Sequence, residues 1–172
     1  VLDRREATKW DVCIRSTLPQ YVFSNAVKLM EEPLCLAFHK DSWLRNVEKV
    51  RLSDIRNEKF VMLRSGGSIR TISEAIFEKE GIIPDIAFEC DTVNILRRMV
   101  QEGLGVAIWP RYSWRDHLRS ETDFENVCYR PIDNNEFKRS LYLILQKDLK
   151  MTEELTEFCK YTEKYFNNIK EE

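Results

Sequence analysis

KFVMLRSGGSIRTISEAIFEKEGIIPDIAFECDTVNILRRMVQEGLGVAIWP, residues 59–110, decides the fold class of the chain. Three apolar runs in it have the length of buried strands, namely 59–64, 86–90 and 105–109. Two segments between them, 68–80 and 92–102, repeat apolar residues at helical spacing. This alternation predicts parallel strands joined by right-handed crossovers. We therefore expect an α/β domain with helices packed on a sheet.

Each helical segment carries an apolar stripe and stops at a glycine, Gly81 or Gly103. The first stripe comprises Ile69, Ile72, Ile76 and Phe77. The second comprises Val93, Leu96, Met99 and Val100. These stripes predict which helix faces pack against the sheet.

Two adjacent glycines stand between a strand and a helix, in a chain with only five glycines. They either make a tight turn that needs positive φ, or expose backbone N–H groups to an anion at the helix N-terminus. The two interpretations are compatible, and the stretch alone leaves both open.

Open α/β sheets bind ligands at the carboxyl ends of their strands. Three loops are predicted to converge there, 64–68, 90–92 and 109–111. The candidate effector-binding residues in these loops are Arg64, Ser65, Gly66, Gly67, Ser68, Thr92, Trp109 and Pro110. Their alternative roles are structural: serine and threonine cap helices, Trp109 and Pro110 pack at a strand end, and Arg64 and Arg70 are either solvated or pair with an effector carboxylate.

The composition is that of a globular protein, with 43% apolar and 33% charged residues. A net charge of −2 gives no overall attraction to nucleic acid. The apolar runs are too short to span a bilayer, and the charged opening VLDRREATKW is not a secretory leader. We therefore expect a cytoplasmic protein without a membrane partner.

Five scattered cysteines and two histidines 78 positions apart form no metal-ligand pattern, and C-x-x-C is absent. We expect reduced, buried thiols, no metal and no cofactor. The chain has no G-x-S-x-G, and the acidic pairs Glu31–Glu32 and Glu153–Glu154 are interpreted as solvated. No catalytic residue is predicted, and we expect no enzyme activity.

The flanks predict four more strands and several helical segments. Residues 12–15, 34–38, 127–132 and 141–146 are predicted strands, and a closing helix follows Thr152 as its cap. Residues 22–30 fit a strand or a short helix equally well. Ser53 is a predicted N-cap of a short helical turn, and 111–118 a predicted short helix.

The order of the segments resembles the effector-binding domain of LysR-type transcriptional regulators. The resemblance begins with DVCIR (11–15), EEPLCLAFHKDSWL (31–44) and LSDI (52–55). It continues through FVMLRSGGSIRTISEAIFEKEGIIPDIAFE (60–89) and DTVNILRRMVQEGLGVAIWP (91–110), and ends with RPI (130–132) and RSLYLILQKD (139–148). It covers nearly the whole chain.

The resemblance implies an α/β, two-lobed, periplasmic-binding-protein-like (type 2) fold with Rossmann-like lobes and two crossover strands. Residues 1–38 and 136–172 would form the first lobe, and 39–135 the second. A small effector would bind in the cleft between them. The candidate arginines, Arg64 and Arg70, suggest that this effector is an organic anion. Arg15 and Ser16 follow the first lobe's strand and would face the same cleft.

The family works as homodimers or tetramers and contacts DNA only through an N-terminal winged helix-turn-helix. The chain is expected to lack that winged helix and the start of the first lobe. The predicted function is effector sensing that controls DNA binding and transcription. The alternative is the solute-binding protein of a transporter, which has the same two-lobed fold.

Overall fold

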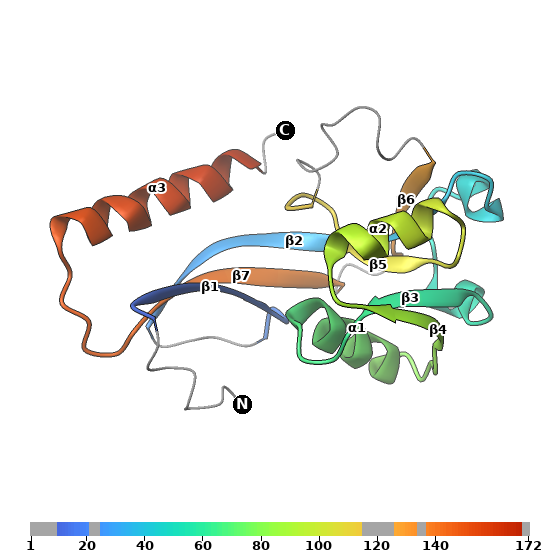
Figure 1. The fold of residues 1–172 in the computed structure, drawn as a ribbon, viewed down its shortest axis with the longest axis horizontal. Coiled ribbons are helices and arrows are strands. Elements are labelled where there is room, and N and C mark those ends of the chain that lie inside the picture. Colours follow the sequence, from blue (N-terminus) through green and yellow to red (C-terminus); the bar gives the residue numbers. More distant parts are fainter. Residues whose placement is uncertain (1–9, 21–24, 115–125, 134–136, 170–172) are drawn as a thin grey trace. The chain divides into compact units, whose positions relative to one another are not determined.

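A computed structural model describes residues 10–20, 25–114, 126–133 and 137–169 of the chain. The chain divides into two compact units. One consists of the described parts of residues 1–31 and 139–172, and the other of those of residues 32–138. Figure 1 labels the helices and strands of both units in chain order.

The first unit is built on antiparallel strands near the two ends of the chain. Strand β1 (Val12–Thr17) pairs with β7 (Lys138–Leu145), whose other neighbour is β2 (Ala26–His39). Helix α3 (Glu153–Ile169) follows, and its predicted cap is confirmed because the Thr152 hydroxyl accepts from the Leu155 N–H at 3.3 Å.

Strand β2 answers a question that the sequence left open. Its 14 residues run without a break from Ala26 to His39, so Ala26–Met30 is extended rather than helical. The run predicted at 34–38 is the second half of the same strand.

The second unit contains the predicted alternation of strands and helices. Strands β3 (Lys59–Leu63) and β4 (Asp85–Cys90) are parallel, which confirms the predicted pairing. Helix α1 (Ser68–Lys79) joins them, and α2 (Val93–Gln101) follows β4. The pairing shifts by one residue in β4, since Phe60 pairs with Ile86 but Val61 pairs with Phe88.

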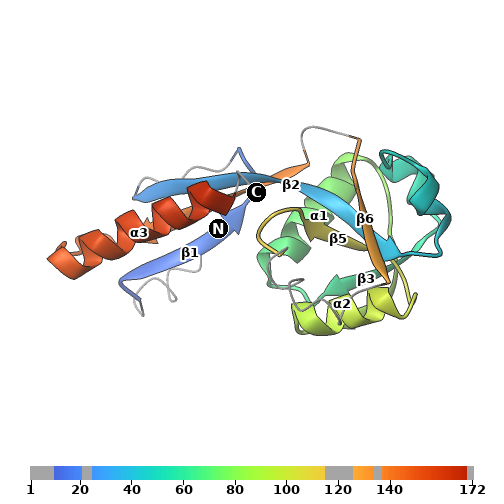
Figure 2. The ribbon, with the colours of Figure 1, turned by 90° about the horizontal axis from the view of Figure 1, so that it is seen from above.

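The two helices cover opposite faces of β3, as Figure 2 shows. Phe60 points toward α1 and meets Phe77 edge-to-face, with ring centroids 5.0 Å apart. The next residue, Val61, belongs to a buried cluster with Leu96 and Val100 of α2. Successive side chains of a strand point to opposite faces, so β3 anchors both helices.

The predicted apolar stripes are largely buried. All four residues of the first stripe are buried, as are Leu96 and Val100 of the second. Gly81 and Gly103, which follow the helices, have φ of +63° and +71°. This left-handed conformation is the one that glycine provides at helix C-termini.

The third central strand differs from the prediction. Val106 makes a parallel bridge with Phe60, but β5 (Ala107–Pro110) then pairs antiparallel with β2. Strand β6 (Val127–Pro131) also pairs antiparallel with β2. The expectation of three parallel strands is therefore correct for β3 and β4 and wrong for most of β5, because β2 provides the longer pairing edge.

Three local predictions need correction. Ser53 is not an N-cap, because the short 3-10 helix Leu52–Ile55 begins after Arg51; another 3-10 helix spans Trp43–Asn46. The described part of 111–118, residues 111–114, is a turn rather than a helix, and the remainder lies outside the described residues. Ser16 does not follow the first strand but lies within it, paired with Leu141.

All five cysteines are free thiols in the structure. Cys35, Cys90 and Cys159 are buried, whereas Cys13 and Cys128 are partly exposed. Burial raises the pKa of the Cys35 thiol to about 12 and also raises the pKa of Cys90 and of Cys159. Because the thiolate is the reactive form, these three thiols should react only slowly at neutral pH.

Candidate functional site

The two parallel strands end side by side. Leu63, the last residue of β3, pairs with Cys90, the last residue of β4, and the Arg64 N–H donates to the Cys90 carbonyl at 2.9 Å. The loops 64–67 and 91–92 therefore leave the same edge of the sheet. We call them the strand-end loops.

The paired glycines of the first strand-end loop have different roles. Gly66 has a φ of +98°, and a Cβ built on it would touch nothing within 4 Å, so the backbone conformation rather than space favours glycine there. Gly67 is extended and is the N-cap of α1, to which it offers no side-chain hydrogen bond. The tight turn is confirmed, while anion binding at the start of α1 stays a prediction.

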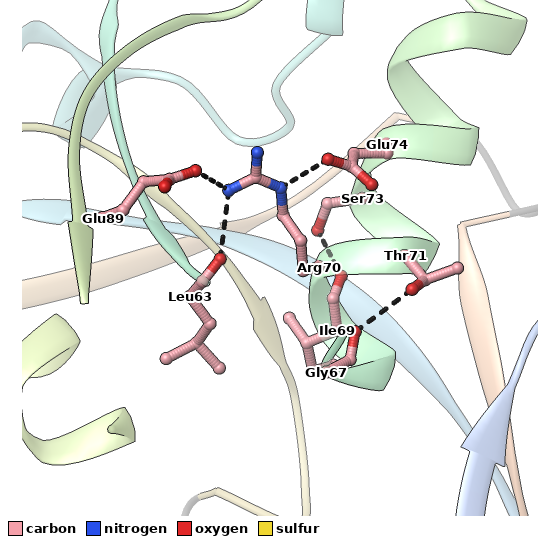
Figure 3. Close-up of polar contacts among 8 residues, drawn as sticks. All are labelled: Leu63, Gly67, Ile69, Arg70, Thr71, Ser73, Glu74 and Glu89. Atoms are coloured by element: carbon pink, nitrogen blue, oxygen red, sulfur yellow. Dashed lines mark hydrogen bonds and ion pairs between the residues drawn. The ribbon is translucent and has the colours of Figure 1, made fainter. Parts of the chain in front are cut away.

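Arg70 has a role that neither sequence interpretation anticipated. Its side chain is 9% exposed and lies between α1 and both strands (Figure 3). Nη1 donates to the Leu63 carbonyl at 3.1 Å and to Glu89, and Nε donates to Glu74 at 2.6 Å. Burial lowers the pKa of Arg70, but the hydrogen bonds and charges of the two glutamates outweigh it and raise that pKa. Arg70 is thus a permanent cation that is neutralised internally.

Arg64 is more accessible than Arg70. Its Nε lies 3.1 Å from Oδ1 of Asp91, and this ion pair joins the two strand-end loops. The two side chains are 67% and 63% exposed. Such a surface pair contributes about 0–1 kcal/mol, so another anion can replace Asp91 at little cost.

Thr92 has the predicted capping role. Its hydroxyl accepts from the Ile95 N–H at 3.4 Å and caps α2. The cap places the Thr92 hydroxyl at the end of β4, next to the Arg64–Asp91 pair. Contact between Thr92 and a ligand stays a prediction.

Trp109 and Pro110 lie in β5 and are buried. This fits the packing role that was the alternative to effector binding. The Trp109 ring meets Trp114 edge-to-face at 5.3 Å, and the Arg97 guanidinium lies 4.9 Å from the Trp109 ring centre. Arg97 also donates to the Trp114 carbonyl at 2.6 Å. Burial lowers the pKa of Arg97. Sequence reasoning missed this arginine, because its partners lie 12 and more positions away.

Glu32 corrects the interpretation of the acidic pairs. Glu32 is 0% exposed, and its carboxylate accepts from the N–H groups of Tyr112 and Ser113, each at 3.0 Å, and from the Ser113 hydroxyl at 2.8 Å. Glu31 lies at the surface, 2.7 Å from Lys28. A signal was present in the sequence: Met30, Glu32 and Leu34 alternate along the strand, so burial of the two apolar residues implies burial of Glu32 on the same face.

Arg15 and Ser16 belong to the first unit, on β1. The Ser16 hydroxyl accepts from Nη1 of Arg139 on β7 at 3.3 Å. This bond holds β1 and β7 together, and a role of either residue in effector binding stays a prediction.

The described residues contain neither a metal-ligand cluster nor a membrane-crossing helix. No group of histidine, cysteine and acidic side chains among them has the arrangement of a metal site. Within the same ranges, no helix combines the length and the apolar character that crossing a membrane requires.

Comparison with known proteins identifies the family. Residues 1–167 match the family described as the LysR substrate binding domain. A "Hydrogen peroxide-inducible genes activator" of Pectobacterium carotovorum subsp. carotovorum is 29% identical over 144 residues, which are 84% of this chain and 46% of that protein. The chain thus spans about half the length of this curated relative.

Solved structures of the same family have a similar fold. The regulatory domain of Synechocystis PCC6803 CcmR in complex with 2-PG gives a TM-score of 0.79 at 18% identity, over 96% of this chain and 77% of that one. The effector-binding domain of QuiR in complex with shikimate gives 0.74 at 18% identity, over 95% and 75%. At this identity the likeness concerns the fold, which is the two-lobed periplasmic-binding-protein-like type.

Proposed function

The chain belongs to the LysR substrate binding domain family, and on that premise we propose that its strand-end loops bind a small-molecule effector. The observation that carries the proposal is the meeting of two loops at the carboxyl ends of parallel strands, each followed by a helix N-terminus. This is the edge at which α/β sheets bind ligands.

The loops provide the kinds of group that bind a small polar molecule. Ser65 and Ser68 carry hydroxyls, Arg64 carries an accessible charge, and the start of α1 favours negative charge. An organic anion fits this set best, with its carboxylate exchanging for Asp91 at Arg64. Shikimate, named as the ligand of the similar QuiR domain, is an example of such an anion.

We propose further that the longer protein regulates transcription. The two compact units would be the two lobes of the fold, and an effector would act through its different affinity for two arrangements of the protein. DNA contacts would come from a winged helix outside this chain, in a cytoplasmic homodimer or tetramer. The relatives are transcription regulators, which disfavours both an enzyme and the solute-binding protein of a transporter.

The Pectobacterium relative is named for genes inducible by hydrogen peroxide, and three of the cysteines of this chain are poorly suited to react with peroxide. Reaction with peroxide proceeds through the thiolate, so burial and raised pKa values disfavour it at Cys35, Cys90 and Cys159, whereas Cys13 and Cys128 are partly exposed. Cys90 is the last residue of β4, directly before the second strand-end loop.

Ligand-induced thermal shift tests the binding proposal. A ligand that binds only the folded protein at 100 times its Kd stabilises it by about 2.7 kcal/mol. With shikimate and a panel of small carboxylates, we expect Ser65→Ala and Ser68→Ala to reduce the shift while leaving the ligand-free Tm nearly unchanged. Ser53→Ala, an exposed serine away from the loops, is the control. Unchanged binding in both loop variants would contradict the proposal.

A further inference from the structure

Arg70 joins three segments at the base of the strand-end loops. Its Nη1 donates both to the carbonyl of Leu63, where β3 ends, and to Glu89, one residue before the end of β4. Each strand-end loop starts within two residues of one of these contacts. The guanidinium therefore links the two strands near the origin of the loops, through the contacts with Leu63 and Glu89 that Figure 3 draws.

The two glutamates bound to Arg70 differ in what they connect. Glu74 lies one turn further along α1, so its ion pair stays within that helix. Glu89 lies 19 residues away on β4, so its ion pair joins α1 to the far strand. Their side chains are similarly exposed, 52% and 45%. Glu74 is therefore a matched control for Glu89.

The second link between the loops is weaker. Both members of the Arg64–Asp91 pair are mostly exposed, and water screens their attraction. Arg70 is buried, and its bonds to carboxylates are charge-assisted, which makes them stronger and geometrically more specific. Arg70 is therefore the stronger of the two side-chain links, in addition to the backbone pairing of β3 with β4, while Arg64 remains accessible.

We propose that Arg70 is a positioning residue, which holds the two strand-end loops at the spacing needed for ligand binding without touching the ligand. That the two loops bind a ligand rests on the proposed function. The positioning itself is a property of the ligand-free protein and can be measured without an effector.

Amide hydrogen exchange, followed by NMR on the intact protein, tests the proposal. The Arg64 N–H bonds to the Cys90 carbonyl at the loop end of β3, and the Val106 N–H bonds to the Lys59 carbonyl at its other end. In Glu89→Ala we expect the exchange of the Arg64 amide to accelerate about tenfold, as loss of a charge-assisted hydrogen bond implies. The Val106 amide should change less than about twofold, because only a local opening is affected.

The control separates positioning from general stability. Glu74→Ala should change the exchange of the Arg64 amide by less than about twofold, since it leaves the bonds to Leu63 and Glu89 in place. Equal acceleration of the Arg64 and Val106 amides in Glu89→Ala would overturn the proposal, and so would equal effects of the two glutamate variants.

A second variant keeps the proposal testable if Glu89→Ala folds poorly. Glu89→Gln keeps the size of the side chain and removes only its charge, and it should accelerate the Arg64 amide in the same sense by a smaller factor. No local acceleration in Glu89→Gln would overturn the proposal in that case. Because no ligand is added, these results are independent of the thermal-shift experiment, so failure of one proposal is distinguishable from failure of the other.

Discussion

Replacing Glu32 with alanine should destabilise the second unit strongly. The carboxylate is fully buried on β2 and accepts three hydrogen bonds from the Tyr112–Ser113 turn. A hydrogen bond to a charged group contributes about 1.5–3 kcal/mol. Removal of the carboxylate also removes its own cost of burial, which offsets part of the loss. We expect a net loss of about 3 kcal/mol in the free energy of unfolding.

The neighbouring residue provides the control. Glu31 pairs with Lys28 at 2.7 Å, and these side chains are 35% and 45% exposed. Glu31→Ala should therefore cost about 0–1 kcal/mol. Glu32→Gln should fall between the two alanine variants, because its amide oxygen can still accept while its NH₂ group cannot.

Urea denaturation, followed by tryptophan fluorescence, measures these differences. Trp109 and Trp114 lie in the same unit and next to the turn, so they report its unfolding. With an m value of about 2 kcal/mol/M, Glu32→Ala should lower the midpoint by about 1.5 M without a change in slope. If Glu31→Ala and Glu32→Ala shifted the midpoint equally, the buried carboxylate would not be what holds the turn.

Three further predictions follow from single residues. Gly66→Ala should cost about 1–2 kcal/mol because of the positive φ, and Gly67→Ala clearly less; equal costs in urea denaturation would contradict the turn assignment. Thr92→Ala should cost about 1 kcal/mol through loss of the α2 cap, measured as a lower Tm, and an unchanged Tm would exclude the cap. Since the folded pKa of Cys35 is raised from 9.0 to about 12, its contribution to stability is complete below pH 9 and is lost as the pH rises toward 12. At pH 9 only about one Cys35 thiol in a thousand is ionised, so iodoacetamide should label it far more slowly in the folded protein than in urea; equal rates by mass spectrometry would refute the raised pKa.

The sequence predicted those parts of the fold that local patterns determine. The stripe from Ile69 to Phe77 and the cap at Thr92 depend on residues within two or three turns of one another, and both are present in the structure. The pairing of β5 with β2 joins Trp109 to Cys35 across 74 positions, and no local pattern records it.

The candidate site shows the same limit. The glycine turn was predictable because a positive φ selects glycine wherever it occurs. The internal pairing of Arg70 was not, because Glu89 comes close only after β4 has paired with β3. Residue type alone suggested a ligand-binding or solvated arginine, and only the tertiary contacts assign it to the protein interior.

The one-residue shift in β4 places Glu89 beside Met62, on the side of α1, and Cys90 beside Leu63, in the cluster packed on α2. If Ala87 were instead paired with Val61, without the shift, every later residue of the strand would exchange faces. The carboxylate would then turn toward the apolar cluster and the thiol toward Arg70. Homologous chains that lack the shift should accordingly have one residue fewer between Asp85 and Cys90 if they keep the carboxylate and the thiol on these two faces.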